Sequence, residues 1–556
     1  MKTLSVYCRN TSQYIEVDGG STLLEIYNGH LRDKLDFVPI CAHVNNKNES
    51  LSFAIFQPKE VEFLPITSAS GRRVYTRSLC MMLYRAATKL YPGVHLRIEH
   101  SISHGYYCLL SDSVKINEET VKAIKEEMRI LQHRDIPFEH LEMRTEEVKE
   151  LFDRQGLTDK TLLLDTVHSL YTPFYRLDGI CDSYYGCLAP STGHMKTFDL
   201  RPYKDGLLLL GTASDNADLP AQPVAQEKMY KAFTEYVDFN HIVGVSNVGE
   251  LNRHVLKHKA ADLVNVSEAL HEKYISRISD EITRRYHEGG ARIVLIAGPS
   301  SSGKTTTTKR LAIQLMTNLL KPKMISLDNY FVDRHMTPRD ESGDYDYESL
   351  YALDLDQFNT DLNRILNGEE IELPTYDFTT GRRTYKGNRL KLDPNSVLLI
   401  EGIHGLNPAL TSHIEDRMKF RVYVSALTTI SIDDHNWVPT TDNRLLRRII
   451  RDYKYRGASA TDTIARWPSV RAGEEKWIFP YQENADATFN SSLLFELGVM
   501  RDIGERILCQ VPRDVPQYAE AYRLRKFLSY FVPISSSSIP STSLLREFLG
   551  GSSFHY

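Results

Sequence analysis

The chain has 556 residues, 42% hydrophobic and 25% charged, with a formal net charge of −5. A single core stops growing at about 250–300 residues, so this length predicts several domains. The slightly acidic balance excludes a global basic field for nucleic acid or an anionic membrane, and any anion site must be local. No stretch approaches a membrane span and no apolar leader follows Met1, so a cytoplasmic protein is expected.

Seven scattered cysteines form no Cys-x-x-Cys pair, which predicts reduced thiols without a zinc or disulfide framework. They are Cys8, Cys41, Cys80, Cys108, Cys181, Cys187 and Cys509.

Two domains are predicted before residue 226. Residues 1–67 favour a β-grasp domain, with strands at 3–8, 51–56 and 61–64 and a helix at 23–27. Residues 68–225 favour an α+β domain whose first helix, 78–90, ends ahead of the proline in Tyr91-Pro92-Gly93.

Residues 226–286 contain few glycines or prolines and predict a helical connector. The remaining segment, 287–556, is expected to be an α/β domain with a parallel sheet and helices on both faces. Near its end, the serine-rich stretch 535–543 predicts a mobile loop before a helical turn at 544–549.

The most informative motif lies at 298–305, between the apolar run 293–297 and a predicted helix at 306–319 carrying Leu311, Leu315 and Leu319 on one stripe. In a strand–loop–helix context, backbone N–H groups and the helix N-terminus can hold the phosphates of ATP or GTP. A plain turn is the alternative. The predicted nucleotide-binding residues are Gly298, Ser300, Ser301, Ser302, Gly303, Lys304, Thr305 and Thr306.

Two acidic residues follow further predicted strands. Asp328 ends the run 324–327 and can accept the proton of an attacking hydroxyl, although a turn or cap aspartate is the alternative. Glu401 ends the run 397–400 and can join Thr305 in binding Mg²⁺, whereas a solvent-facing glutamate is the alternative.

Four arginines, at positions 444, 447, 448 and 451, share one face of the predicted helix 443–457. The opposite face, Leu445, Leu446, Ile449 and Ile450, is expected to be buried. We interpret the basic face as a lid over the triphosphate, with a merely solvated face as the alternative.

Together these motifs resemble the uridine kinase and phosphoribulokinase-like branch of P-loop kinases over about 290–500. The matching segments are the loop 298–305, Asp328-Asn329-Tyr330-Phe331, Tyr345-Asp346, Pro374-Thr375-Tyr376-Asp377-Phe378, Glu401-Gly402-Ile403 and the arginine helix. The resemblance implies ATP, Mg²⁺ and a small nucleoside acceptor. Because related kinases are often tetramers, it also allows a homo-oligomer.

The resemblance further implies residue roles. Asp328 is the general base, Asp346 holds the ribose hydroxyls, and Tyr376 and Phe378 pack on the base. Arg444 lies near the acceptor sugar. Arg447 and Arg451 lie near the ATP phosphates, and Arg447 joins Lys304 and Asp328 as catalytic. One position departs from the family: Gly381 stands where uridine–cytidine kinases usually carry a base-contacting histidine.

The N-terminal half resembles the editing region of threonyl-tRNA synthetases preceded by a TGS domain, over residues 1 to about 215. The anchors are the segment from Ser78 to Gly93, which includes the predicted helix 78–90, and Gly105-Tyr106-Tyr107. The family's HxxxH pair is Arg77 and Met81 here, and a later cysteine-and-histidine pair is also lost, near Tyr184 and Leu188. His100, His104 and His194 are expected to be structural. No deacylase activity is expected, and this half is interpreted as a scaffold, regulatory module or oligomerisation surface.

The sequence therefore predicts an ATP-dependent kinase acting on the 5′-hydroxyl of uridine or cytidine. Gly381 keeps open a different acceptor: another nucleoside, a sugar or a pantothenate-like alcohol. A nucleotide- or tRNA-sensing regulator is the alternative from another class, against which the net charge and the lack of a basic stripe argue.

Overall fold

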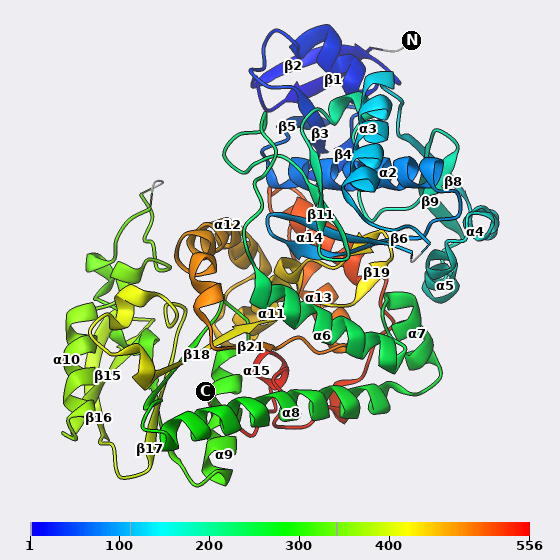
Figure 1. Ribbon diagram of the computed structural model, residues 1–556. Coiled ribbons are helices and arrows are strands. Elements are labelled where there is room, and N and C mark those ends of the chain that lie inside the picture. Colours follow the sequence, from blue (N-terminus) through cyan, green and yellow to red (C-terminus); the bar gives the residue numbers. More distant parts are fainter. Residues whose placement is uncertain (1–2, 112, 341–342, 556) are drawn as a thin grey trace.

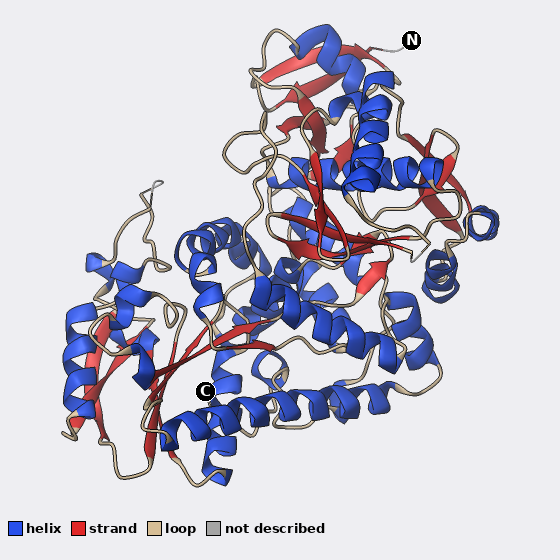
Figure 2. Cartoon of the chain, in the orientation of Figure 1, coloured by secondary structure: helices blue, strands red, loops and turns tan. Residues whose placement is uncertain are grey.

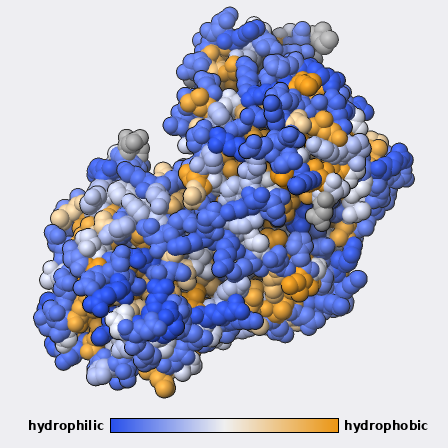
Figure 3. All heavy atoms as spheres, in the orientation of Figure 1, coloured by the Kyte–Doolittle hydropathy of each residue, from blue (hydrophilic) through white to orange (hydrophobic). Residues whose placement is uncertain are grey.

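The protein is described by a computed structural model that covers residues 3–111, 113–340 and 343–555. Figure 1 shows the N-terminal half above the C-terminal half, with the green helices of the connector between them and along the lower edge. On the face drawn in Figure 3, hydrophobic residues form scattered patches among hydrophilic ones. Within the described ranges, no helix has the length and apolar character needed to cross a membrane. All seven cysteines are free thiols.

The first domain is a five-stranded sheet in the order β2-β1-β5-β3-β4, in which only the β1–β5 pair is parallel. Its elements are β1 (Thr3–Cys8), β2 (Gln13–Asp18), α1 (Leu23–Ile26), β3 (Pro39–Val44), β4 (Lys47–Ser50) and β5 (Glu60–Pro65). The strand predicted at 51–56 is wrong. The backbone of Leu51 and Phe53 accepts hydrogen bonds from the start of α1 instead, because Leu51 and Ile55 turn inward to the core.

The second domain packs helices against two antiparallel sheets, β11-β12-β7-β6 and β10-β9-β8. Its strands are β6 (Leu96–Ile102), β7 (Gly105–Leu110), β8 (Glu139–Arg144), β9 (Tyr171–Leu177), β10 (Ile180–Asp182), β11 (Asp199–Tyr203) and β12 (Gly206–Leu210). Its helices are α2 (Ala69–Leu90), α3 (Glu118–Arg134), α4 (Thr145–Arg154) and α5 (Thr158–Val167). Helix α2 begins nine residues before the prediction because the Ser68 hydroxyl caps it by accepting from the Gly71 N–H.

Three helices follow, as predicted for the connector: α6 (Glu227–Val243), α7 (Val248–Leu256) and α8 (Ala260–His287). In Figure 1 and Figure 2 the long α8 runs below α6 and α15 and reaches α9 of the C-terminal half. Its residues Ile275, Ile278 and Ile282 belong to the same hydrophobic core as that half.

The C-terminal half is built on a five-stranded parallel sheet in the order β14-β17-β13-β18-β21. The central strand β13 (Ile293–Ala297) is buried on both faces. Ile293 and Leu295 enter one core, with α10 (Leu355–Leu366), whereas Val294 and Ile296 enter the other, with α8 and α9 (Lys304–Thr317). This alternation confirms an α/β domain with helices on both faces of its sheet.

The remaining strands of this half are β14 (Lys321–Ser326), β15 (Ile371–Asp377), β16 (Arg382–Leu390), β17 (Ser396–Glu401), β18 (Lys419–Ser425), β19 (Ser431–Asp433), β20 (Asn436–Trp437) and β21 (Ala487–Asn490). The remaining helices are α11 (Thr440–Tyr455), α12 (Ala460–Trp477), α13 (Glu496–Leu508), α14 (Tyr518–Leu528) and α15 (Arg546–Leu549). Leu319, predicted on the buried stripe of the first helix, is 84% exposed, because α9 ends before it and its φ is +64°.

A buried ionic cluster joins the two halves. The Lys160 Nζ of α5 lies 2.8 Å from Asp182 Oδ1 and 2.8 Å from Asp433 Oδ1, with all three side chains at most 3% exposed. The His435 Nδ1 lies 2.8 Å from Asp182 Oδ2. Asp433 and His435 belong to the β19–β20 hairpin, so the C-terminal half supplies charges that the N-terminal half neutralises.

Candidate active site

The predicted phosphate loop connects β13 to α9 at the centre of the parallel sheet. A side chain at Gly298 would overlap the carbonyl oxygen of Val424, so only glycine fits there. Ser301 and Gly303 have φ angles of +59° and +83°, which turn the chain tightly into the start of α9. The predicted nucleotide-binding residues are thus brought together around one helix N-terminus, a ready site for an anion.

Lys304, the first residue of α9, is folded back onto the loop, where its Nζ donates to the Pro299 carbonyl at 3.1 Å. Burial lowers its pKa, while Glu401, Asp328, Glu547 and Glu348 oppose that shift in this order. The ammonium group therefore lies among carboxylates at the mouth of the loop.

Thr305 and Glu401 are in contact, as the metal-site prediction requires. The Thr305 hydroxyl lies 3.3 Å from both Glu401 carboxylate oxygens, and Ser326 Oγ lies 3.3 Å from one of them. Burial, followed by the nearby Asp328, raises the pKa of Glu401 to about 7. The described ranges hold no cluster of three His, Cys, Asp or Glu side chains that could bind a metal alone. The pair nevertheless fits Mg²⁺, which usually takes further oxygen ligands from water and substrate phosphates.

Asp328 follows β14 within a 3-10 turn, Leu327–Tyr330, at the same edge of the sheet. Burial raises the pKa of its carboxyl, and the charges of Lys304, Arg456 and Arg451 oppose this. A carboxylate facing a cation across a phosphate loop is placed to accept a proton from a hydroxyl.

The structure brings the aromatic residues of the predicted acceptor site together. The rings of Tyr376 and Phe378 lie 5.1 Å apart, and Phe331 lies 5.5 Å from Tyr376. Tyr376 is 6% exposed, and its hydroxyl has no hydrogen-bond partner among the residues described. The Asp346 Oδ1 accepts a 3.1 Å hydrogen bond from the Glu348 N–H, which stabilises the turn that carries Asp346. Its contact with a ribose stays a prediction.

Gly381 has a φ of +69°, and a side chain added there would come within 2.8 Å of Arg334. The Arg334 guanidinium also donates to the Phe378 carbonyl. The space beside Gly381 is therefore filled by Arg334, from another part of the chain.

The arginine helix forms as predicted, and Leu445, Leu446, Ile449 and Ile450 are buried. The expectation of one open basic face is wrong for two of its members. Arg444 and Arg447 are 1% and 0% exposed, because they pair with Glu474 and Glu496 inside the core.

These two buried arginines support the phosphate loop from behind. The Arg444 Nε donates to the Ser300 carbonyl at 3.0 Å, and the Arg447 Nη1 donates to the Ser301 carbonyl at 3.4 Å. Arg448 donates to the Ser300 hydroxyl at 2.7 Å. Arg451 binds the neighbouring Asp452 at 2.9 Å and lies near enough to Asp328 to influence its pKa.

Three acidic residues of the site were missed from the sequence. Glu474 accepts a hydrogen bond from the Ser300 N–H at 3.1 Å, and Glu496 accepts one from the Arg447 Nε at 2.9 Å. The pKa of Glu348 is raised to about 7 by burial, then by Glu474. Each of the three lies outside the recognised motifs. The only signal in the sequence was that four arginines on a helix with an apolar face would need acidic partners if they were buried.

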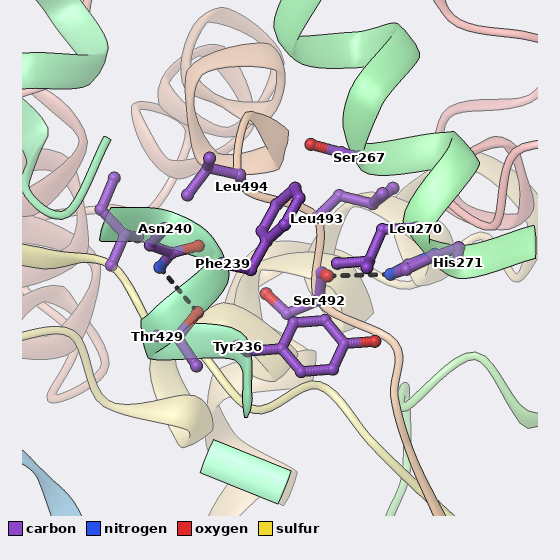
Figure 4. A pocket seen from close by; sticks show the side chains of 11 residues that line it. Tyr236, Phe239, Asn240, Ser267, Leu270, His271, Thr429, Ser492, Leu493 and Leu494 are labelled. Atoms are coloured by element: carbon purple, nitrogen blue, oxygen red, sulfur yellow. Dashed lines mark hydrogen bonds between the residues drawn. The ribbon is translucent and has the colours of Figure 1, made fainter. Parts of the chain in front are cut away.

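A separate cavity of about 20 Å³ lies between α6, α8 and the segment after β21, lined in part by Tyr236, Asn240 and His271 (Figure 4). The His271 Nε2 lies 3.0 Å from the Ser492 carbonyl, and the Asn240 Nδ2 lies 3.0 Å from Thr429 Oγ1. Such a volume holds about one water molecule, so this cavity is too small for a nucleoside.

In the N-terminal half, the positions expected to have lost their catalytic side chains are filled. Arg77 is 5% exposed and donates to the Cys187 carbonyl at 3.0 Å, while a side chain at Gly186 would come within 2.6 Å of its guanidinium. Met81 is fully buried. Burial also lowers the pKa of His100 to about 3, so its ring, stacked on Phe233, stays neutral.

Comparisons with known proteins place the C-terminal half. Residues 293–493 match the phosphoribulokinase / uridine kinase family. A uridine kinase of Staphylococcus epidermidis is 30% identical over 195 residues, which cover 35% of this chain and 84% of the relative. A uridine kinase of Staphylococcus haemolyticus is 29% identical over the same shares. A solved structure described as a possible uridine kinase from Bacillus stearothermophilus aligns with a TM-score of 0.26 at 20% identity, covering 38% of this chain and 97% of that one.

A phosphate loop on a central parallel strand, with a lysine, a threonine–glutamate pair and a facing aspartate, defines a P-loop phosphotransferase. The chain belongs to the phosphoribulokinase / uridine kinase family. The match begins at residue 293, so the TGS-like and synthetase-like assignments of the N-terminal half stay predictions.

Proposed function

We propose that the protein transfers the γ-phosphoryl group of ATP to the 5′-hydroxyl of a nucleoside, with uridine or cytidine as the acceptor. The observation that supports this most directly is the arrangement of Lys304, Thr305, Asp328 and Glu401 around one loop. The relatives named uridine kinase support the choice of acceptor.

In the proposed reaction, the Asp328 carboxylate accepts the proton of the 5′-hydroxyl. The acceptor oxygen forms a bond to the γ-phosphorus, the bond to the bridging oxygen breaks, and ADP leaves. The Lys304 Nζ leaves the Pro299 carbonyl and binds the phosphates of ATP. Thr305 and Glu401 would hold Mg²⁺, which supplies charge neutralisation on the phosphates when bound.

A different acceptor is the second candidate, and the filled position beside Gly381 favours it. A base pocket depends on each hydrogen bond, so exchanging a histidine for an arginine from another segment changes which base edge fits. A nucleotide- or tRNA-sensing role remains the candidate from another class.

A panel of nucleosides and simple alcohols, incubated with ATP and Mg²⁺, tests the proposal. We expect one or two nucleosides to be converted to monophosphates, with ADP formed in equal amount. Conversion of a sugar or a pantothenate-like alcohol instead would keep the kinase assignment and change the acceptor. ADP formation that needs tRNA would contradict the kinase assignment and support a sensor.

Asp328→Asn tests the base. We expect ATP binding to persist while turnover falls by about 10²–10⁴-fold, because the amide cannot accept the proton. Turnover within a factor of three of the unchanged protein would remove Asp328 from this role.

A further inference from the structure

The C-terminal segment of the chain reaches back to the phosphate loop. Leu544, Leu545 and Phe548 are fully buried in the same core as α9 and α11. Leu544 lies against Gly303, where an added side chain would come within 2.6 Å of it. The ring of Phe548 lies 5.1 Å from the Arg447 guanidinium. This segment is therefore fixed beside the loop by packing that does not involve a nucleotide.

Between these anchors, Glu547 places its carboxylate on the first turn of α9. Its Oε2 accepts from the Thr306 hydroxyl at 2.6 Å and from the Thr306 N–H at 3.3 Å. It also lies near enough to Glu401 to add to the rise in that group's pKa, and near enough to Lys304 to oppose the lowering of its pKa by burial. A negative side chain from 241 residues away thus occupies the phosphate loop's own helix terminus.

The contact has a clear physical origin. The first N–H groups of a helix lack partners within it, and the residue preceding α9 is Gly303, which has no side chain to cap them. A carboxylate satisfies such donors and is favoured by the helix dipole. A nucleotide phosphate is favoured there for the same reasons, so both anions compete for the Thr306 donors.

We propose that Glu547 is a built-in occupant of the phosphate site, which a nucleotide phosphate must displace in order to bind. This inference rests on the proposed nucleotide site at residues 298–306. The Glu547 side chain turns off Thr306 while Leu544, Leu545 and Phe548 keep the segment in place. The fraction of molecules with free donors then sets the apparent affinity for nucleotide.

Calorimetric titration of the full chain with ADP and with AMP tests the proposal. Removing a charge-assisted competitor in Glu547→Ala should lower the Kd for ADP by about tenfold, and for AMP by a similar factor. Glu547→Gln keeps the shape and should give a smaller gain. Glu126→Gln, an exposed carboxylate in α3, is the matched control and should leave both Kd values unchanged.

Simple repulsion between Glu547 and the phosphates would also tighten binding in these variants. At 1 M KCl the screening length falls to about 3 Å, so a gain from distant repulsion would vanish, whereas displacement of a direct contact persists.

These measurements distinguish a failure of the Glu547 proposal from a failure of the nucleotide site. Equal Kd values for Glu547→Ala and the unchanged protein, or a gain lost at 1 M KCl, would overturn this inference and leave the proposed kinase intact. If no form of the protein bound ADP or AMP, the nucleotide site itself would be refuted. A gain in affinity that persists at 1 M KCl would establish the competition.

Discussion

Arg447→Met should destabilise the C-terminal half strongly, because Arg447 is buried against its partner. The guanidinium is 0% exposed, Glu496 is 1% exposed, and the Arg447 Nη2 also donates to the Ser491 carbonyl at 2.8 Å. Removing one member of a buried ion pair leaves the other charge uncompensated, at a cost of about 3–5 kcal/mol. We expect the free energy of unfolding to fall by that amount.

Tryptophan fluorescence during urea unfolding reports on the C-terminal half, because Trp437, Trp467 and Trp477 all lie there. Arg451→Met is the control. Among the partners described, its guanidinium binds only Asp452, which also pairs with Arg448 and Arg456. Asp452 therefore keeps cationic partners in this variant, and a loss below about 1 kcal/mol is expected.

The double variant Arg447→Met with Glu496→Leu removes both charges, and much of the lost stability should return. An Arg447→Met protein within about 1 kcal/mol of the unchanged one would refute the reasoning. In that case the guanidinium would be free to face a ligand, as the sequence first suggested.

Three further outcomes follow from the site. Lys304→Ala should abolish the thermal shift that saturating ATP produces, a stabilisation of about 2.7 kcal/mol at one hundred times Kd; a full shift would exclude Lys304 from the site. The pKa of Glu401 is raised to about 7, and its carboxyl must lose the proton to bind a cation. The Mg²⁺ affinity measured by titration should therefore rise between pH 6 and 8. A rise of the same size in Glu401→Gln would contradict this. Gly298→Ala should lower the melting temperature and abolish ATP binding because its methyl group overlaps a backbone carbonyl, whereas Gly29→Ala, in open space, should do neither.

Much of the C-terminal fold followed from local patterns. The strand before the phosphate loop, the helix after it and the arginine helix were predictable because each combines a hydrophobic period with a recognisable boundary. The contact between Thr305 and Glu401 was predictable as well, since neighbouring parallel strands end at the same edge of the sheet.

Burial of the arginines was not predictable from the helix alone. Spacing shows which residues share a face, but not whether that face meets solvent or carboxylates from α12 and α13. Glu547 was missed for a similar reason: its partner, Thr306, is 241 residues away, and no local pattern encodes such a contact.

The strand expected at 51–56 failed for a different reason. Leu51 and Ile55, four residues apart, are both buried, and hydrogen bonds to the start of α1 replaced a sheet partner. Hydrophobic content alone could not distinguish an inward-turning loop from a strand there.

The ionic cluster around Lys160 has a consequence for dividing the chain into fragments. A fragment starting at residue 287 would lack Lys160 and Asp182, so Asp433 and His435 would lose these partners and face water. We therefore expect each half to be more stable within the full chain than as a separate fragment.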